Sequence, residues 1–399
     1  MSALSQALTQ LRAGQMVVLV DDEDRENEGD LVIAAQFATP DAINFMASNG
    51  KGLVCLALST QQIDRLGLQP MVAQNHARRS TAFTVSIEAR DGITTGISAH
   101  DRARTIQAAA NPQAQAGDIV SPGHVFPLRA ADGGVLVRNG HTEGAVDLMR
   151  LAGLQPSAVI CEVMRDDGEM ARRPDLERFA AEHNLPVLSI RDIVTHRVRT
   201  ELLVEEVASA ELPTAFAKDA LKVHAFRSTL DGTEHLAIVK HPLPKIPLVR
   251  LHSECLTGDA LGSLRCDCGA QLQESLRLIS ESDGGALIYL RGQEGRGIGL
   301  ANKIRAYALQ DKGLDTVEAN AALGFAPDAR DYGIAAQMLT ALGISSLTLL
   351  SNNPDKADAL ERYGINVAER RPLNIAPNPF NLRYLTTKRE KFGHTFHHQ

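Results

Sequence analysis

Three of the chain's five cysteines fall within fourteen residues, and this group restricts the local fold more than any other feature of the sequence. Cys255, Cys266 and Cys268 lie in the segment SECLTGDALGSLRCDCG. Structural zinc sites fill all four positions with protein ligands, whereas catalytic sites use three and keep the fourth for water. Because no fourth cysteine follows, the segment predicts a zinc site with one open position.

Two other interpretations of the cysteines remain open. His252, three residues before Cys255, could close the site as a structural knot of three cysteines and one histidine. A disulfide is the weaker alternative, because the sequence lacks an apolar amino-terminal signal and a long apolar run. The lack of both features predicts a cytoplasmic location, where thiols stay reduced. Cys55 and Cys161 lie in apolar segments and are expected to be buried as small hydrophobic residues.

The composition indicates a globular protein that acts on small molecules. Its 399 residues are enough for two or three domains, and 44% hydrophobic with 22% charged residues is ordinary for such a chain. The net charge of −7 argues against nucleic acid or a membrane as the main partner, but it leaves room for a local phosphate pocket.

A change of pattern near residue 200 divides the chain into two halves, 1–200 and 201–399. In the first half, MVVLVDD reads as a buried strand that runs into an acidic loop, TAFTVSIEA as a half-buried strand and PDAINFMAS as a short helix. In the second half, GALIYLRG and SLTLLS read as strands followed by turns and helices. QLQESLRLI has helical spacing, which places Cys268 at a helix entrance.

Seven carboxylates and one arginine occupy the ten residues Asp21–Asp30, directly after the first expected strand. One interpretation is a solvated acidic turn, which is common for a run of charges. The position at a strand end favours a site instead, because hard divalent cations bind carboxylate and substrate oxygens. Arg25 within the run would then serve a phosphate.

A second polar group lies in RNGHTEGAVDL, where a glycine-bearing turn is expected to open a helix. Backbone amides at such a helix start favour an anion. A lone histidine in this position is more often a capping or packing residue. His124 in SPGHVFPL and Glu162 in ICEVM add ionisable groups in apolar settings, where such groups need partners or a function.

Together, DDEDRENEGD, TAFTVSIEARDGITTGISAHDRA, PGHVFPL and GHTEGAVDL resemble the signature segments of 3,4-dihydroxy-2-butanone 4-phosphate synthase, over nearly all of residues 1–200. The resemblance implies a magnesium-dependent (or manganese-dependent) conversion of D-ribulose 5-phosphate that releases formate. It implies that Glu26 and His141 bind the metal and that His124 and Glu162 form an acid/base pair. The substrate-binding residues that it implies are Arg25, Glu26, Asp30, Arg138, His141, Thr142 and Glu162. The sequence departs from the family pattern at Ser121 and at Lys51 in SNGKGLVC, which bears on phosphate affinity more than on chemistry.

The segments VRLHSECLTGDALGSLRCDCG, RGQEGRGIGLANKIRAYALQDKGLDTVEAN and SNNPDK closely resemble GTP cyclohydrolase II throughout residues 201–399. This resemblance implies that Cys255, Cys266 and Cys268 bind zinc, and that GTP enters with Mg²⁺. The GTP contacts that it implies are Arg250, Glu254, Gln271, Glu294, Arg296, Thr316, Ser351 and Lys356, with Ser351 in place of the usual threonine. The catalytic residues that it implies are Asp328 as proton acceptor, Arg330 as nucleophile towards the α-phosphate and Tyr307 in the ring chemistry.

We therefore expect an α+β synthase domain followed by an α/β zinc-containing cyclohydrolase domain, in a homodimer whose synthase site is built at a subunit interface. One alternative keeps the synthase but makes the second half a GTP-binding regulator without turnover. Such a regulator would not need Asp328 or Arg330, and the chain has both. A second alternative is the structural zinc knot with His252 in a protein-interaction domain.

Overall fold

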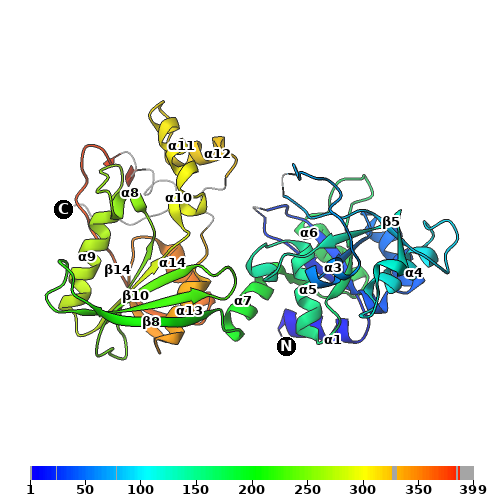
Figure 1. Ribbon diagram of the computed structural model, residues 1–399, viewed down its shortest axis with the longest axis horizontal. Helices are drawn as coiled ribbons and strands as arrows, with labels where there is room; N and C mark the ends of the chain where they lie inside the picture. The colour runs from blue at the N-terminus through cyan, green and yellow to red at the C-terminus, as the bar shows by residue number, and fades with distance from the viewer. Residues whose placement is uncertain (1, 24, 78, 326–329, 383–384, 387–399) are drawn as a thin grey trace. The chain divides into compact units, whose positions relative to one another are not determined.

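The computed structural model describes residues 2–23, 25–77, 79–325, 330–382 and 385–386 (Figure 1). The chain forms two compact units, Met1–Arg197 and Val198–Gln399. Each unit contains one seven-stranded mixed sheet with helices packed on it. No helix in the described part of the chain combines the length and the apolar character that crossing a membrane requires.

The first unit alternates helices and strands around a mainly antiparallel sheet with strand order β4-β5-β3-β6-β2-β1-β7. Its elements are α1 (Ala3–Arg12), β1 (Val17–Val20), β2 (Gly29–Ala34), α2 (Pro40–Phe45), β3 (Cys55–Leu58), α3 (Thr60–Arg65), β4 (Ile87–Ala89), α4 (Ala99–Ala110), β5 (Ile119–Arg129), α5 (His141–Ala152), β6 (Ser157–Glu162), α6 (Arg173–Glu182), β7 (Val187–Ser189) and α7 (Ile190–Thr200). The last helix runs across the division between the two units.

Helices cover both faces of this sheet. Successive strand residues point to opposite sides, so each strand contributes side chains to the cores on both faces. In β1, Val18 and Val20 face the core under α2, α4 and α6, whereas Val17 and Leu19 face the core under α1 and α5. The four residues are nearly or fully buried, which explains why this strand reads as an unbroken apolar run. Gly144 lets α5 approach the sheet, since a Cβ there would lie 2.8 Å from a methyl carbon of Leu19.

The second unit joins an antiparallel half-sheet to a parallel one, with strand order β14-β13-β11-β12-β10-β9-β8. Its elements are β8 (Val204–Leu212), β9 (Leu221–Ser228), β10 (Glu234–Lys240), β11 (Leu248–Ser253), α8 (Leu256–Asp259), α9 (Cys268–Glu281), β12 (Gly285–Leu290), α10 (Glu294–Gly297), α11 (Leu300–Gln310), α12 (Thr316–Ala322), α13 (Gly333–Ala341), β13 (Ser346–Leu350), α14 (Pro354–Arg362) and β14 (Asn366–Arg371).

The strand β11 lies between β12 and β13, and the three strands are parallel. Their carboxyl ends therefore meet at one edge of the sheet, which is where open α/β sheets bind ligands. The helices α8, α10 and α11 follow β11 and β12 in the chain and lie at that edge (Figure 1). A small core of Leu248, Leu287, Leu350 and Ile279 fixes α9 against the sheet below the strand ends.

Most elements expected from the sequence are present. MVVLVDD contains β1, GALIYLRG contains β12, SLTLLS contains β13, and α9 begins at Cys268. The segment TAFTVSIEA differs, because only Ile87–Ala89 forms a ladder, while Phe83 and Thr84 make isolated bridges. The weakly periodic stretch after residue 200 contains β8, an edge strand whose middle residues are exposed on both faces and so show no alternation.

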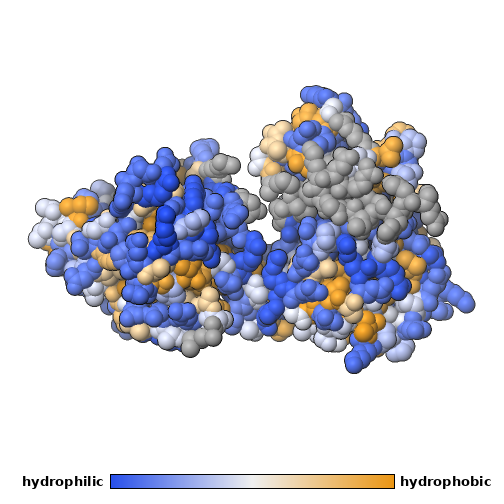
Figure 2. Space-filling model, turned by 180° about the vertical axis from the view of Figure 1, so that it is seen from behind, coloured by the Kyte–Doolittle hydropathy of each residue, from blue (hydrophilic) through white to orange (hydrophobic). Residues whose placement is uncertain are grey.

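The surface is mainly hydrophilic, with apolar residues in small groups, on the face that Figure 2 shows. Both units thus bury most of their large apolar side chains inside, as the ordinary composition predicts.

Candidate active sites

The acidic run of the first unit is a folded loop rather than a solvated turn. The Asp21 carboxylate accepts the backbone amides of Glu26 at 3.0 Å and Glu28 at 2.8 Å, and it pairs with Arg25 at 2.9 Å. Arg25 also contacts the carboxylate of Glu26 at 2.6 Å. Asp21 and Asp30 are only 8% and 3% exposed, so the loop and the start of β2 hold two carboxylates away from bulk water.

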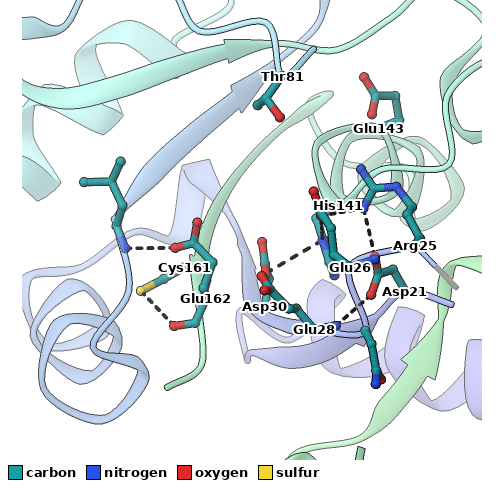
Figure 3. Close-up of polar contacts among 12 residues, drawn as sticks. Asp21, Arg25, Glu26, Glu28, Asp30, Thr81, His141, Glu143, Cys161 and Glu162 are labelled. Carbon is teal, nitrogen blue, oxygen red and sulfur yellow. Dashed lines mark hydrogen bonds and ion pairs between the residues drawn. The ribbon is translucent and has the colours of Figure 1, made fainter. Parts of the chain in front are cut away.

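His141 opens α5 and points its ring into this loop (Figure 3). Its Nδ1 lies 3.8 Å from the carboxylate of Glu26 and 3.9 Å from that of Asp30. Its Nε2 and the Oδ1 of Asp30 are buried without a hydrogen-bond partner among the described residues. Burial lowers the pKa of His141, so the ring is neutral and can donate a lone pair. Asp21, Glu26 and His141 place one ligand atom each within 4.8 Å of one another, which fits a divalent cation.

Asp30 and Glu162 face each other across two antiparallel strands, β2 and β6. Burial raises the pKa of Asp30 well above the ordinary carboxyl value, and the charges of Glu162, Glu28 and Glu26 raise it further. Burial and the neighbouring Glu26 also raise the pKa of Glu28. A bound cation would relieve this repulsion, which is a second reason to place a metal here.

Arg138 and Thr142 lie on either side of the turn that starts α5. Arg138 pairs with the buried Glu143 at 2.5 Å and donates to the hydroxyl of Thr81 at 3.2 Å. Glu143 also accepts the amide of Ala131 at 3.0 Å, so it fixes the loop that carries Arg138. Thr142 is buried in the first helical turn, next to His141.

His124 and Glu162 are not bonded to each other in the described chain. The Nδ1 of His124 contacts the carboxylate of Glu88, and the His124 side chain is 45% exposed. Glu162 accepts the amide of Leu53 at 2.8 Å. Of the two departures from the family pattern, Lys51 pairs with Asp166, and Ser121 is exposed on β5.

We predict that Asp30→Asn stabilises the first unit at pH 7.5 in the presence of a chelator. Because the folded-state pKa of Asp30 is raised, the folded state is more stable when this carboxyl is protonated. That stability is present at low pH and is lost as the pH rises through the raised pKa. A gain of about 1 kcal/mol corresponds to about 2–4 °C in Tm for a unit of this size. The gain should shrink towards pH 4, near the ordinary carboxyl pKa of about 3.9.

The exposed Asp91→Asn serves as the control and should leave the Tm unchanged. Differential scanning calorimetry of the full chain measures both variants. An Asp30→Asn variant that melts below the wild type at pH 7.5 with chelator would contradict the prediction.

The three cysteines of the second unit form a compact group at the edge where β11 ends. The Sγ atoms of Cys255 and Cys266 are 3.7 Å apart, and each of the three cysteines has its sulfur within 4.8 Å of the others. In a tetrahedral site with Zn–S bonds of about 2.3 Å, two sulfurs lie about 3.8 Å apart. All five cysteines are free, so the structure does not contain the disulfide that was the weaker alternative.

The backbone around the cysteines is built for this spacing. A Cβ on Gly258 would lie 2.8 Å from the Sγ of Cys266 and 3.1 Å from that of Cys255, so only glycine leaves the sulfurs room to converge. Hydrogen bonds from the two other thiols lower the pKa of Cys255, and Lys303 lowers it further. The same closeness raises the pKa of Cys266 to about 11. A cation is therefore needed before all three thiols ionise together.

His252 is held by other groups and does not join the three thiols. Its Nε2 lies 3.0 Å from both carboxylate oxygens of Asp259, which also accepts the hydroxyl of Tyr289 at 2.8 Å and the amide of Cys255 at 3.0 Å. The metal-binding group found among the described residues at this edge contains the three sulfurs and not His252. This geometry disfavours the structural knot and favours a site with an open position.

One cavity gathers the residues that the sequence singled out in the second unit. Every expected residue that the structure describes lines this cavity: Arg250, Glu254, Cys255, Cys266, Cys268, Gln271, Glu294, Arg296, Tyr307, Thr316, Arg330, Ser351 and Lys356. Asp328 lies outside the described residues. The lining carries six cationic side chains and two carboxylates, in a chain whose net charge is −7. Such a pocket suits a ligand with several negative charges.

The strand ends hold the cationic side chains in place. Arg250 on β11 donates to the carbonyl oxygen of Leu350 at 2.8 Å and to the amide oxygen of Gln271 at 2.5 Å. Lys356 donates to the carbonyl oxygen of Leu251 at 2.8 Å. Because the hydrogen bonds of the buried Arg250 go to neutral oxygens, they do not pair its charge with a carboxylate, and this charge can attract an anionic ligand.

Sequence reasoning missed several residues of the two sites. Asp21 was part of the acidic run, but nothing in the run distinguished it as the carboxylate around which the loop folds. Asp259 was hidden in the cysteine segment as an ordinary polar residue. Lys303 gave a weak signal, a lysine one helical turn before Tyr307, which places both on the same side of α11.

We predict that Gly258→Ala weakens zinc binding by about 10- to 100-fold, the range typical of changes beside metal ligands. The added methyl group would push against the sulfurs of Cys266 and Cys255. His252→Ala should in contrast retain one zinc per chain, because Asp259 and not the metal holds that ring. Competition with a chromogenic chelator measures the zinc affinity of both variants. If His252→Ala loses its zinc and Gly258→Ala does not, the structural knot with His252 as a ligand is supported instead.

The family comparisons divide the chain where the structure does. The model of 3,4-dihydroxy-2-butanone 4-phosphate synthase matches residues 5–196, and the model of GTP cyclohydrolase II matches residues 205–372. The riboflavin biosynthesis protein RibBA of Aquifex aeolicus is 54% identical over 99% of this chain and 98% of its own length. A bifunctional chloroplastic riboflavin biosynthesis protein of Arabidopsis thaliana is 50% identical over 99% of this chain and 73% of its own length.

A solved structure also resembles most of the chain. The crystal structure of RibBX from A. baumannii, a two-domain 3,4-dihydroxy-2-butanone 4-phosphate synthase, covers 93% of this chain and 99% of its own. The two are 38% identical, with a TM-score of 0.72.

Proposed function

Because the chain belongs to the RibBA family of riboflavin biosynthesis proteins, we infer that it is a bifunctional enzyme with one activity in each unit. The first unit converts D-ribulose 5-phosphate to 3,4-dihydroxy-2-butanone 4-phosphate and formate. The second hydrolyses GTP to 2,5-diamino-6-ribosylamino-4(3H)-pyrimidinone 5′-phosphate, formate and pyrophosphate. The single observation that carries this inference is that every described residue expected at the second site lines one cavity beside three converging thiols.

In the synthase unit, Glu26 and His141 hold Mg²⁺ or Mn²⁺, with Asp21 as a further ligand. When bound, the cation supplies positive charge to the substrate oxygens while a proton is removed from carbon. Arg25, Arg138 and Thr142 bind the sugar phosphate, and Asp30 orients its hydroxyl groups. Two cations of this set, Arg25 and Arg138, now pair with carboxylates of the site and would exchange those partners for the phosphate.

His124 and Glu162 move protons to and from the substrate. The carboxylate of Glu88 holds Nδ1 of His124 and so leaves Nε2 for proton transfer. Glu162 lies opposite Asp30 at the end of β6, beside the cation-binding loop. These assignments place the metal, the phosphate-binding arginines and one of the two proton-transfer groups at the same edge of the sheet.

In the cyclohydrolase unit, Cys255, Cys266 and Cys268 hold Zn²⁺. When bound, zinc lowers the pKa of a water molecule at its open position. Arg250, Arg296 and Lys356 bind the triphosphate with its Mg²⁺, and Gln271, Thr316 and Ser351 add neutral hydrogen-bonding groups. Glu254 and Glu294 accept hydrogen bonds from the guanine base.

Three further residues complete the cyclohydrolase assignment. The Tyr307 hydroxyl lies 3.3 Å from that of Thr257, next to the thiols, so it serves the ring opening. Arg330 approaches Ser253 at 3.4 Å and stabilises charge at the α-phosphate, because a guanidinium remains protonated and is a poor nucleophile. Asp328 is assigned by resemblance alone as the proton acceptor.

A zinc-containing GTP-binding regulator without turnover has no support in the family matches. We place the enzyme in the cytoplasm, since five free cysteines and an open thiolate site need a reducing environment.

Reciprocal inactivation tests the division of labour. We predict that Cys266→Ser abolishes formate and pyrophosphate release from GTP and leaves formate release from D-ribulose 5-phosphate unchanged. Glu162→Gln should do the opposite, lowering the synthase rate by about 10²- to 10⁴-fold, the usual contribution of a general acid or base. Each purified protein is assayed with each substrate separately. A wild-type chain that binds GTP but releases neither product would show that the second unit is a regulator.

The synthase site is completed by a second copy of the chain. His124 is half-exposed and does not contact Glu162 within the described chain, although proton transfer requires both at one substrate. In a homodimer, His124 of one protomer can serve the site that holds Glu162 of the other.

Complementation tests this arrangement. We predict that His124→Ala and Glu162→Gln, each nearly inactive alone, regain synthase activity when they are produced together. Random pairing gives one intact site in half of the dimers, so about a quarter of the wild-type activity is expected. Light scattering gives the mass of the assembly in the same samples. Absence of any regain in a mixed dimer would place both residues in one protomer's site.

A further inference from the structure

A lysine points into the cyclohydrolase cavity and touches one of the three thiols. Lys303 lies on α11 and is only 8% exposed. Its Nζ is 3.0 Å from the Sγ of Cys255 and 2.5 Å from a carboxylate oxygen of Glu294. An ammonium is costly to bury unless it is paired, so these two contacts fix where the charge lies.

The two partners of Lys303 belong to different parts of the site. Cys255 follows β11 and is one of the three thiols that converge. Glu294 begins α10 after β12, and its other carboxylate oxygen accepts the amide of Leu256 at 2.7 Å. Lys303 therefore connects the cluster of three cysteines to the loop after β12. The Tyr307 ring lies one helical turn further on, with its centroid 5.7 Å from Nζ.

Charge explains why such a lysine matters at this site. Three thiolates around Zn²⁺ leave a net charge of −1, and thiolates donate more electron density than the neutral histidines of many catalytic zinc sites. Both effects make the metal a weaker acid towards a fourth ligand. Hydrogen bonds to ligating sulfurs and nearby charges counteract this, because they draw electron density away from the metal.

We propose that Lys303 is a positioning residue that tunes the zinc centre by donating a hydrogen bond to the Cys255 thiolate and compensating its negative charge. The proposal rests on the proposed cyclohydrolase function of the second unit. In this role Lys303 acts on the metal through the sulfur of Cys255, and Glu294 holds the ammonium in line with that sulfur. The competing explanation is that Lys303 only neutralises Glu294 and thereby shapes the GTP pocket.

The Co²⁺-substituted full-length protein separates these two explanations. Its thiolate-to-cobalt charge-transfer absorption reports the electron density on the sulfurs without requiring turnover. In Lys303→Met this band should move to longer wavelength, because the sulfur loses its hydrogen bond. Lys303→Arg keeps a cationic donor and should stay close to the wild type. Glu294→Gln removes the negative charge but keeps an oxygen that accepts from the ammonium, so Lys303 stays beside Cys255 and the band should also stay close to the wild type.

Kinetics with the zinc enzyme provide the second readout. In Lys303→Met, kcat for formate release from GTP should fall by about 10- to 100-fold while KM changes little, because the loss concerns the metal rather than GTP binding. Lys312→Met, an exposed lysine just after the same helix, is the matched control and should leave both constants unchanged.

Each outcome decides the question. A shifted band, or loss of metal from Lys303→Met that Lys303→Arg restores, supports the proposal. A Lys303→Met band identical to the wild type, or metal loss from both Lys303 variants, overturns it. Failure of the wild-type chain to release formate from GTP would instead refute the cyclohydrolase function, and the cobalt band would still report the contact between Lys303 and Cys255.

Discussion

Both sites depend on groups of like charge that the fold brings together at an edge of a sheet. In the first unit, the strand pairing sets Asp30 opposite Glu162, and the loop after β1 adds Asp21 and Glu26. In the second, the end of β11 and the start of α9 bring three thiols to within 4.8 Å. Each arrangement carries an electrostatic cost that burial increases. The rest of each site can be understood as a way of offsetting that cost.

The two units offset it differently. The carboxylates of the first unit include Asp30, whose pKa is raised by burial and by its neighbours, and the His141 ring beside it is neutral. Such a site is poised for a cation that arrives from solution. The second unit supplies much of its compensation itself, since Lys303 contacts Cys255 and Glu294, and arginines line the cavity. That excess of cationic groups also suits it to a triphosphate.

The sequence and the structure agree best where chemistry and local pattern coincide. The expected strands β1, β12 and β13 are apolar runs, and the helices α5 and α9 begin at the polar groups that mark their entrances. The segment TAFTVSIEA and the edge strand β8 were less predictable. In the first, the pattern of a half-buried strand extends over more residues than the ladder, which contains only Ile87–Ala89, with isolated bridges before it. In the second, the middle residues are exposed on both faces, so the sequence shows no alternation.

The sequence by itself determined the family, the residue types at both sites and the three closely spaced cysteines, because motif spacing along the chain is fixed by local backbone geometry. Only the tertiary structure showed that His252 is held by Asp259 rather than joined to the thiols, and that Glu88 holds His124. It alone showed that Lys303, some fifty residues from Cys255 in the chain, donates to that sulfur. These contacts join different strands and helices, and no local pattern can encode a distance that the packing of the whole unit sets.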